Sequence, residues 1–223
     1  MSHLRILLII LLNGLCTARF TKVHFEAPNL SNYPRLRLLG TLPTLTEFTL
    51  CSWIKSPKNG TLISYRTSTS DRFLVTISGA NVETTIGSES IKLNCENYKE
   101  RYWNHLCISW TGQDGRLKIF MNEKICDVAS RPQIAAGGRI HEGGTLVIGQ
   151  YQHDEDLKFD PDQAWVGNIA VLRLWDEMLT FEQIVKAGKC NGHQKDGNII
   201  TLMKTPMSAM DGVIFSKTHL CEL

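Results

Sequence analysis

Short apolar or alternating runs recur along the whole chain. Turn signals such as PKNG at 57–60, QDG at 113–115 and GG at 143–144 separate them. The runs cover residues 48–54, 61–65, 73–77, 90–93, 106–110, 117–121, 145–148 and 167–174. Many short strands at this spacing are typical of two antiparallel sheets packed as a sandwich. The pattern therefore predicts an all-β fold, and the polar residues that interrupt 203–210 favour a plain loop there.

One segment departs from the strand pattern. Thr180 and Gln183 have the spacing of a capping box, in which each side chain satisfies a free backbone N–H at the start of a helix. Gly188 supplies a helix stop. These signals predict a single short helix at about 181–187.

The first 18 residues have the order of a cleavable signal peptide. A lone Arg5 precedes an apolar run at 6–12, and small residues follow at 16–18. The apolar run is too short to span a bilayer, which needs about 20 residues of helix. We therefore expect a secreted protein with no membrane span, in which residues 1–18 are removed and 19–223 form one domain.

Charge gives no case for nucleic acid as a partner. The chain has 24 Lys and Arg against 22 Asp and Glu, a net charge of +2, and removal of Arg5 lowers this to 23 minus 22, or +1. Binding to phosphate backbones depends on a clear excess of positive charge. No Pro-rich, Ser-rich or low-complexity linker divides the mature chain, which agrees with a single domain.

Cysteine usage agrees with export. Cys16 leaves with the signal peptide, and an even set remains: Cys51, Cys95, Cys107, Cys126, Cys190 and Cys221. Six cysteines allow 15 pairings, between which spacing cannot choose. A zinc site is the competing interpretation, but no two of these cysteines are two to four residues apart, so disulfides are favoured.

Two Asn-x-Ser/Thr acceptors for glycosylation begin at Asn29 and Asn59. Such short motifs also arise by chance. Glycosylation at both sites is an expectation that suits a secreted chain.

Residues 149–167 (GQYQHDEDLKFDPDQAWVG) combine four aspartates, one glutamate and three glutamines directly after an apolar run. Calcium takes about 6 to 8 oxygen ligands from carboxylates, amides and carbonyls in a loose geometry, so this segment suits calcium better than zinc or magnesium. The alternative is an acidic loop that merely faces water.

The sequence HLCISW at 105–110 resembles the signature of the pentraxin family, His-x-Cys-x-Ser/Thr-Trp-x-Ser/Thr. Gly112 departs from the final Ser/Thr of that signature. Further landmarks lie in the family's order: FTLCSW at 48–53, ISY at 63–65, IGQ at 148–150, VGNI at 166–169, LWD at 174–176, FEQI at 181–184 and DGVIF at 211–215. The opening PRL at 34–36 and GTLP at 40–43 is similar to C-reactive-protein-like members of invertebrates. Ser109 and Trp110 of the signature are expected in the core and the sheet, not in a binding site.

The resemblance implies a jelly roll of two sheets with the helix on one face and paired calcium ions on the other. The ions would hold an anionic headgroup, and several copies on a cyclic homo-oligomer would raise the avidity of a weak contact. The expected ligands are phosphocholine, phosphate or carbohydrate groups on microbial or damaged-cell surfaces, in an innate-immune role. The family disulfide corresponds to Cys51 with Cys107, and we pair Cys95 with Cys126 and Cys190 with Cys221.

Residue by residue, the family's calcium ligands correspond to Asp71, Asp160, Gln163 and the backbone carbonyl of Gln152. These four would bind calcium. If the loop repacks, Asp154 could add an oxygen, as could Glu155 or Asp156.

Three positions depart from the family's ligand set. Arg72 stands in place of an asparagine, and Tyr151 and His153 stand in place of bridging carboxylates. Each change removes an oxygen donor, and Arg72 adds positive charge, so calcium is expected to bind weakly or to be lost. Tyr151 and His153 could instead serve a different ligand.

The family's choline contacts correspond to Ile77, Thr85 and Glu89. A carboxylate at Glu89 could balance a quaternary ammonium, while Ile77 would supply apolar contact. Residues 78–90 align loosely with the family, so an ordinary exposed Glu89 is the alternative.

Two other classes of function were weighed. An enzyme has little support, because Gly-x-Ser-x-Gly is absent and neither His141-Glu142 nor His153-Asp154 belongs to a His-Glu-x-x-His helix. The second is a divergent pentraxin with a degraded calcium site that acts as a calcium-independent binder or as an assembly subunit.

Overall fold

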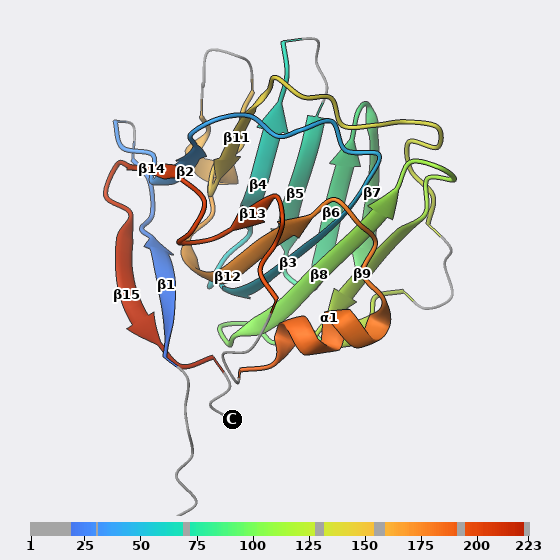
Figure 1. Ribbon diagram of the computed structural model, residues 1–223. Helices are drawn as coiled ribbons and strands as arrows, with labels where there is room; N and C mark the ends of the chain where they lie inside the picture. The colour runs from blue at the N-terminus through green and yellow to red at the C-terminus, as the bar shows by residue number, and fades with distance from the viewer. Residues whose placement is uncertain are drawn as a thin grey trace, which may run out of the picture.

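Two antiparallel sheets form the two layers of the molecule (Figure 1). The computed structural model describes residues 19–29, 31–68, 72–127, 132–153, 159–190 and 195–220. One sheet has the order β10 (Lys124–Ile125), β9 (Leu117–Met121), β8 (Asn104–Thr111), β3 (Glu47–Lys55), β12 (Gly167–Trp175), β1 (Phe20–Phe25) and β15 (Ile214–Thr218), with β13 (Ile200–Thr201) beside β12. The other has the order β14 (Met207–Met210), β2 (Arg35–Leu38), β11 (Thr145–Ile148), β4 (Gly60–Arg66), β5 (Arg72–Ser78), β6 (Asn81–Ile86) and β7 (Glu89–Asn94).

The neighbours within these sheets are mostly distant in sequence. Strand β3 pairs with β8 and β12, and β1 pairs with β15, so the first and last described strands lie side by side. This nonlocal antiparallel pairing is the arrangement of a β-sandwich. The predicted all-β fold of two antiparallel sheets is confirmed.

Strand β5 shows how alternation divides the core from the surface. Phe73, Val75 and Ile77 are buried, whereas Arg72, Leu74 and Thr76 between them are partly exposed. Period-two alternation places the first set between the sheets and the second on the outer face. In the core, the Phe48 ring lies 4.5 Å from that of Phe73 across the sandwich and 5.8 Å from that of Trp110.

The only regular α-helix among the described residues is α1 (Phe181–Gly188), next to the predicted 181–187. Its capping box is present, with Gln183 N donating to the Thr180 hydroxyl and Thr180 N donating to the Gln183 side chain. Ile184 of the helix packs with Phe120 and Trp175 on the outer face of the sheet that contains β8 and β3 (Figure 1). No helix within the described residues has the length and apolar character needed to cross a membrane.

Some strands were not predicted. Residues 203–210, expected as a loop, contain β14, and the loosely aligned 78–90 contain β6. Strand β14 is short and shows no alternation of burial, so its hydrogen bonds to β2 and not its pattern define it. Strands β1, β2, β10, β13 and β15 were also missing from the prediction.

Candidate functional site

The segment that joins β11 to β12 is fixed at both ends against the sheet. Gly149 N donates to Leu62 O at 3.1 Å, and Trp165 N donates to Gly149 O at 2.9 Å. A Cβ on Gly60 would lie 2.4 Å from Ala164 O, so the close approach of the returning chain to β4 requires glycine. The described parts, 149–153 and 159–167, therefore start and finish at the same place beside β4.

Two buried glutamines tie the start of this segment to its surroundings. The Gln152 side-chain amide donates to Ser64 O at 2.8 Å and to Thr145 O at 3.1 Å. The Gln150 amide donates to Pro34 O at 3.0 Å. Both side chains are buried, so they hold the backbone in place. The predicted metal ligand of Gln152 is its backbone carbonyl, and that assignment stays a prediction.

Asp160 and Gln163, both predicted metal ligands, lie together around the short 3-10 helix η1 (Pro161–Gln163). Asp160 Oδ1 accepts from Asp162 N at 2.9 Å, and Oδ2 accepts from Gln163 Nε2 at 3.0 Å. These two hydrogen bonds, in this order of importance, hold the pKa of Asp160 below its usual value, with a smaller contribution from nearby His153. The carboxylate is therefore ionised throughout the neutral range.

Aromatic rings complete this cluster. His153 Nε2 lies 3.8 Å from Asp160 Oδ2 and 3.4 Å from Gln163 Nε2. The Tyr151 ring meets the His153 ring edge-on, with centroids 4.6 Å apart. Two rings in edge-on contact thus occupy the positions at which the resemblance implies bridging carboxylates.

The described residues do not fit a paired calcium site. Calcium takes about 6 to 8 oxygen ligands, and two ions share their carboxylates only where bridging groups are present. Here Asp160 Oδ2 already accepts from the amide of Gln163, and among the described residues Asp160 supplies the only carboxylate in hydrogen-bond or ion-pair contact with Gln163 or His153. The other predicted acidic ligands, Asp71 and Asp154, lie outside the described residues.

A hollow of about 530 Å³ opens beside this cluster. Its floor is the outer face of β5, β6 and β7, and Tyr151 and Gln163 form one wall. We call it the hollow, and its lining residues are Arg72, Leu74, Thr76, Glu83, Thr85, Gly87, Ser88, Ser90, Tyr151 and Gln163.

The two charged residues of the hollow lie at opposite ends of its floor. Arg72 O accepts from Gly87 N at one end, and Glu83 pairs with Thr76 at the other. Arg72 and Thr76 are four residues apart on β5, or about 13 Å at 3.3 Å per strand residue. Hydroxyl groups lie between them, with Thr85 Oγ1 and Ser90 Oγ 2.7 Å apart.

The three predicted choline contacts have different outcomes. Thr85 lines the hollow. Ile77 does not, because the alternation of β5 turns it into the core, where it is 2% exposed, so its assignment as an apolar contact is wrong. The outward apolar residue of the same strand is Leu74.

Glu89 is exposed but lies outside the lining of the hollow. Its carboxylate accepts from Ala135 N at 3.1 Å. The carboxylate that does line the hollow is Glu83, on the neighbouring β6. Sequence reasoning missed Glu83 because it treated 78–90 as a loosely aligned loop, whereas the alternation within β6 would have indicated its outward side.

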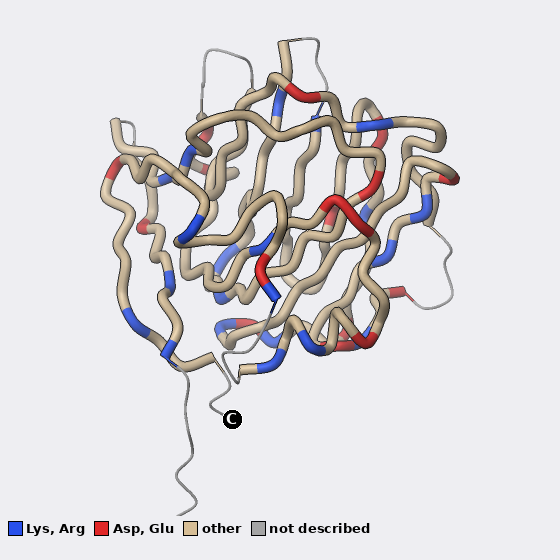
Figure 2. Tube along the Cα trace, viewed as in Figure 1, with Lys and Arg blue, Asp and Glu red and all other residues tan. Residues whose placement is uncertain are grey.

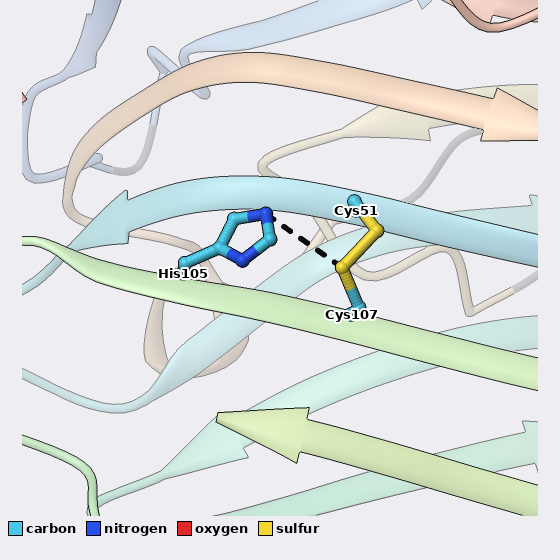
Figure 3. A group of neighbouring side chains, drawn as sticks. All are labelled: Cys51, His105 and Cys107. Carbon is cyan, nitrogen blue, oxygen red and sulfur yellow. Dashed lines mark hydrogen bonds between the residues drawn. A yellow bond between two sulfur atoms is a disulfide. The ribbon is translucent and has the colours of Figure 1, made fainter. Parts of the chain in front are cut away.

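A second cluster of candidate ligands lies on the other sheet. Cys51, His105 and Cys107 have their sulfur and nitrogen atoms within 4.8 Å of one another (Figure 3). The two sulfurs form a disulfide between β3 and β8, so neither is a thiolate that could bind a metal. Burial, with a smaller effect of Arg173, lowers the pKa of His105 to about 3. The cluster is part of the core and not a metal site.

The disulfides agree with the expected pairing as far as the structure describes them. Cys51 bonds to Cys107, and Cys95 bonds to Cys126. The third pair includes Cys221, which lies outside the described residues. The glycosylation candidates Asn29 and Asn59 are both exposed, and their modification stays a prediction.

Comparisons with known proteins agree with this architecture. Residues 22–217 match the Pentaxin family. C-reactive protein 1.1 of Limulus polyphemus is 35% identical over 212 residues, which cover 90% of this chain and 87% of that protein. Neuronal pentraxin-2 of Mus musculus is 30% identical over 201 residues, or 87% of this chain and 46% of that longer protein.

A solved structure gives the same result. The crystal structure of a native heptameric SAP-like pentraxin from Limulus polyphemus superposes with a TM-score of 0.84 and 30% identity, and the match covers 92% of this chain and 98% of that one. The two-sheet jelly roll and its single short helix are therefore those of this family. The chain belongs to the pentaxin (pentraxin) family.

Proposed function

We propose that this chain is a secreted recognition protein whose hollow binds phosphocholine, phosphate or carbohydrate groups on microbial or damaged-cell surfaces, in innate immunity. The observation that carries the proposal is the hollow of about 530 Å³, with a cation and an anion at opposite ends of a floor of hydroxyl groups. Family membership makes the chain a binding protein and not an enzyme.

The lining suits a small polar headgroup. Hydroxyl groups of Thr76, Thr85 and Ser90 can donate to and accept from sugar or phosphate oxygens. Arg72 offers a forked donor for an anionic oxygen, and Glu83 offers a negative charge for an ammonium group. Concave sites with a few converging polar groups are the usual places for small ligands.

A ring of identical subunits completes the proposal. The similar SAP-like pentraxin from Limulus polyphemus is heptameric, which supports a cyclic homo-oligomer here. A shallow hollow gives weak binding at one site, and several copies on one ring convert weak sites into avid attachment to a surface. The predicted signal peptide at 1–18 and the disulfides of the described residues support secretion.

Calcium has a minor place in this proposal. Asp160 and Gln163, with Asp71, Asp154 and the carbonyl of Gln152 as predicted further ligands, would hold at most one weakly bound ion. The described residues lack the bridging carboxylates of a paired site, so no step of ligand capture is assigned to metal.

Filling the hollow tests the proposal. Thr76→Trp places an indole on the outer face of a central strand, where aromatic residues are well tolerated, and blocks the floor. We expect the secreted wild type to be retained on phosphocholine or sugar resins, and the variant to lose at least about tenfold in affinity for the same probe, the equivalent of 1.4 kcal/mol.

Lys22→Trp is the matched control. It introduces the same side chain at a partly exposed position of β1, on the other sheet. It should bind like the wild type. Retention of Thr76→Trp at wild-type affinity, or no retention of the wild type on any of these resins, would contradict the proposed site.

A further inference from the structure

We infer that Arg72 holds the anionic oxygens of the ligand directly and that Arg66 beside it adds positive charge. Arg72 would thus act where the resemblance to the pentraxin family implies a metal ion. The ligand class is a phosphate ester or another small oxyanion, bound without calcium. This inference rests on the proposed function, because it concerns the same hollow.

The two arginines are direct cross-strand neighbours. Arg66 on β4 lies opposite Arg72 on β5, and Thr145 on β11 lies on the other side of Arg66. Both arginines are on the outer face, because Tyr65 and Phe73, the adjacent pair, point into the core. Arg72 lines the hollow, and Arg66 lies beside it on the neighbouring strand β4.

This pair is costly without an anion. Like charges directly opposite on antiparallel strands are destabilising. Within the described part of the chain, no carboxylate forms an ion pair with either arginine. In addition, Arg66 Nε and Nη1 are shielded from solvent and have no hydrogen-bond partner. A bound oxyanion in the hollow would reduce this repulsion and would accept hydrogen bonds from Arg72, which lines it.

The alternative, metal-mediated capture, is disfavoured at the same place. The resemblance implies an asparagine oxygen at position 72, where this chain has the positively charged Arg72. It also implies carboxylates at the positions of Tyr151 and His153. A cation beside the hollow repels calcium and attracts the oxyanion that calcium would have attracted. Guanidinium also matches the geometry of phosphate oxygens with two parallel hydrogen bonds.

The charge at the far end of the hollow sets a limit on the ligand. Glu83 lines the same hollow as Arg72, so a polyanion would meet repulsion there. A small phosphate ester that carries a cationic group satisfies both ends. Phosphocholine should therefore bind more tightly than inorganic phosphate, which uses the Arg72 end alone.

Calorimetry of the secreted protein in excess EDTA tests the inference, with phosphocholine and inorganic phosphate as separate probes. We expect saturable binding of phosphocholine that calcium does not strengthen. Arg72→Gln removes the charge at similar size and should weaken phosphocholine binding by about tenfold or more, since hydrogen bonds to charged groups are about twice as strong as those between neutral groups. Arg72→Lys keeps the positive charge but loses the forked pair of donors. Its affinity for phosphocholine should lie between those of the wild type and Arg72→Gln.

Arg37→Gln is the matched control. Arg37 is exposed on β2 of the same sheet and does not line the hollow, so this variant makes the same change in net charge and should bind like the wild type. Thermal unfolding of each variant separates lost binding from lost structure. If inorganic phosphate alone binds as tightly as phosphocholine, the contribution of Glu83 is excluded and the ligand is a free oxyanion.

Two results would overturn the inference. One is binding by Arg72→Gln equal to that of the wild type. The other is capture of phosphocholine that appears only with calcium and vanishes in EDTA. In either case, loss of binding in Thr76→Trp would still support the hollow as the ligand site, so the proposed function and this inference can fail separately.

Discussion

Two clusters among the described residues, one on each sheet, differ in how their side chains could hold a ligand. The cluster of Cys51, His105 and Cys107 has residue types that bind transition metals, at close range. The hollow has one arginine, one glutamate and a set of hydroxyl groups. The first is buried and its two sulfurs are joined in a disulfide, whereas the second is open and keeps uncompensated charge.

The difference shows that bonding, protonation and burial decide what a side chain can bind more than its residue type does. Both sulfurs of the first cluster are joined in a disulfide, and His105 is 3% exposed with a pKa of about 3, so it is buried and neutral (Figure 3). Arg72 of the hollow carries a guanidinium group and is partly exposed. Figure 2 shows Lys and Arg interspersed with Asp and Glu along the described trace.

The largest expected effect concerns the closed cluster. The double variant Cys51→Ala with Cys107→Ala opens a loop with a sequence separation of 56 between its ends. The chain-entropy relation gives a loss of about 4 kcal/mol in the free energy of unfolding, within the usual range for native disulfides. Denaturant unfolding measures it, and phosphocholine binding by the folded fraction should not change.

The contrast between a buried, disulfide-bonded cluster and an open binding hollow would be wrong if Cys51, His105 and Cys107 bound a metal. Stoichiometric zinc in the purified wild type, or a loss of less than about 1 kcal/mol in the double variant, would show that the cysteines are not a structural disulfide. The shorter-loop pair, Cys95→Ala with Cys126→Ala, should give a similar but slightly smaller loss, because its sequence separation is 31.

The next effect is a pH dependence that arises from His105. Its pKa is about 3 in the folded protein and about 6.5 when unfolded, so the unfolded state binds the proton more readily. Its contribution to stability is therefore fully present above pH 6.5 and is lost as the pH falls from 6.5 toward 3. At pH 5 the free energy of unfolding should be about 2 kcal/mol lower than at pH 8 from this group alone.

Denaturant unfolding of His105→Gln at pH 5 and pH 8 checks this. The difference in the free energy of unfolding between the two pH values should be about 2 kcal/mol smaller in the variant than in the wild type. His24→Gln, which removes a histidine from β1 of the same sheet, is the control and should keep the wild-type pH difference. An NMR titration of the His105 ring in the wild type gives a second measurement if the variant folds poorly. Protonation of that ring near pH 6 would contradict a closed cluster.

The strands of the core could be predicted, because β3, β5, β8 and β12 are long and either alternate or are buried throughout. Strands such as β14 and β15 could not, since they are short, lie at sheet edges and bury no regular face. The hollow was only partly predictable. A shift of one position in a strand turns a side chain to the opposite face, and Ile77 points into the core whereas its neighbour Thr76 lines the hollow.

The smallest expected effect is the change in the free energy of unfolding on adding calcium. It tests whether a metal ion or Arg72 serves the ligand at the hollow. A single site with few described oxygen ligands should bind in the millimolar range, so about 2 mM calcium at a Kd of about 1 mM adds only about 0.6 kcal/mol to the free energy of unfolding. Asp160→Ala should abolish this increment, and Glu100→Ala, which removes an exposed carboxylate from the β7–β8 connection, should keep it. Two ions bound at micromolar calcium would mean that carboxylates outside the described residues rebuild the paired site. Arg72 would then be a neighbour of the metal and not its replacement.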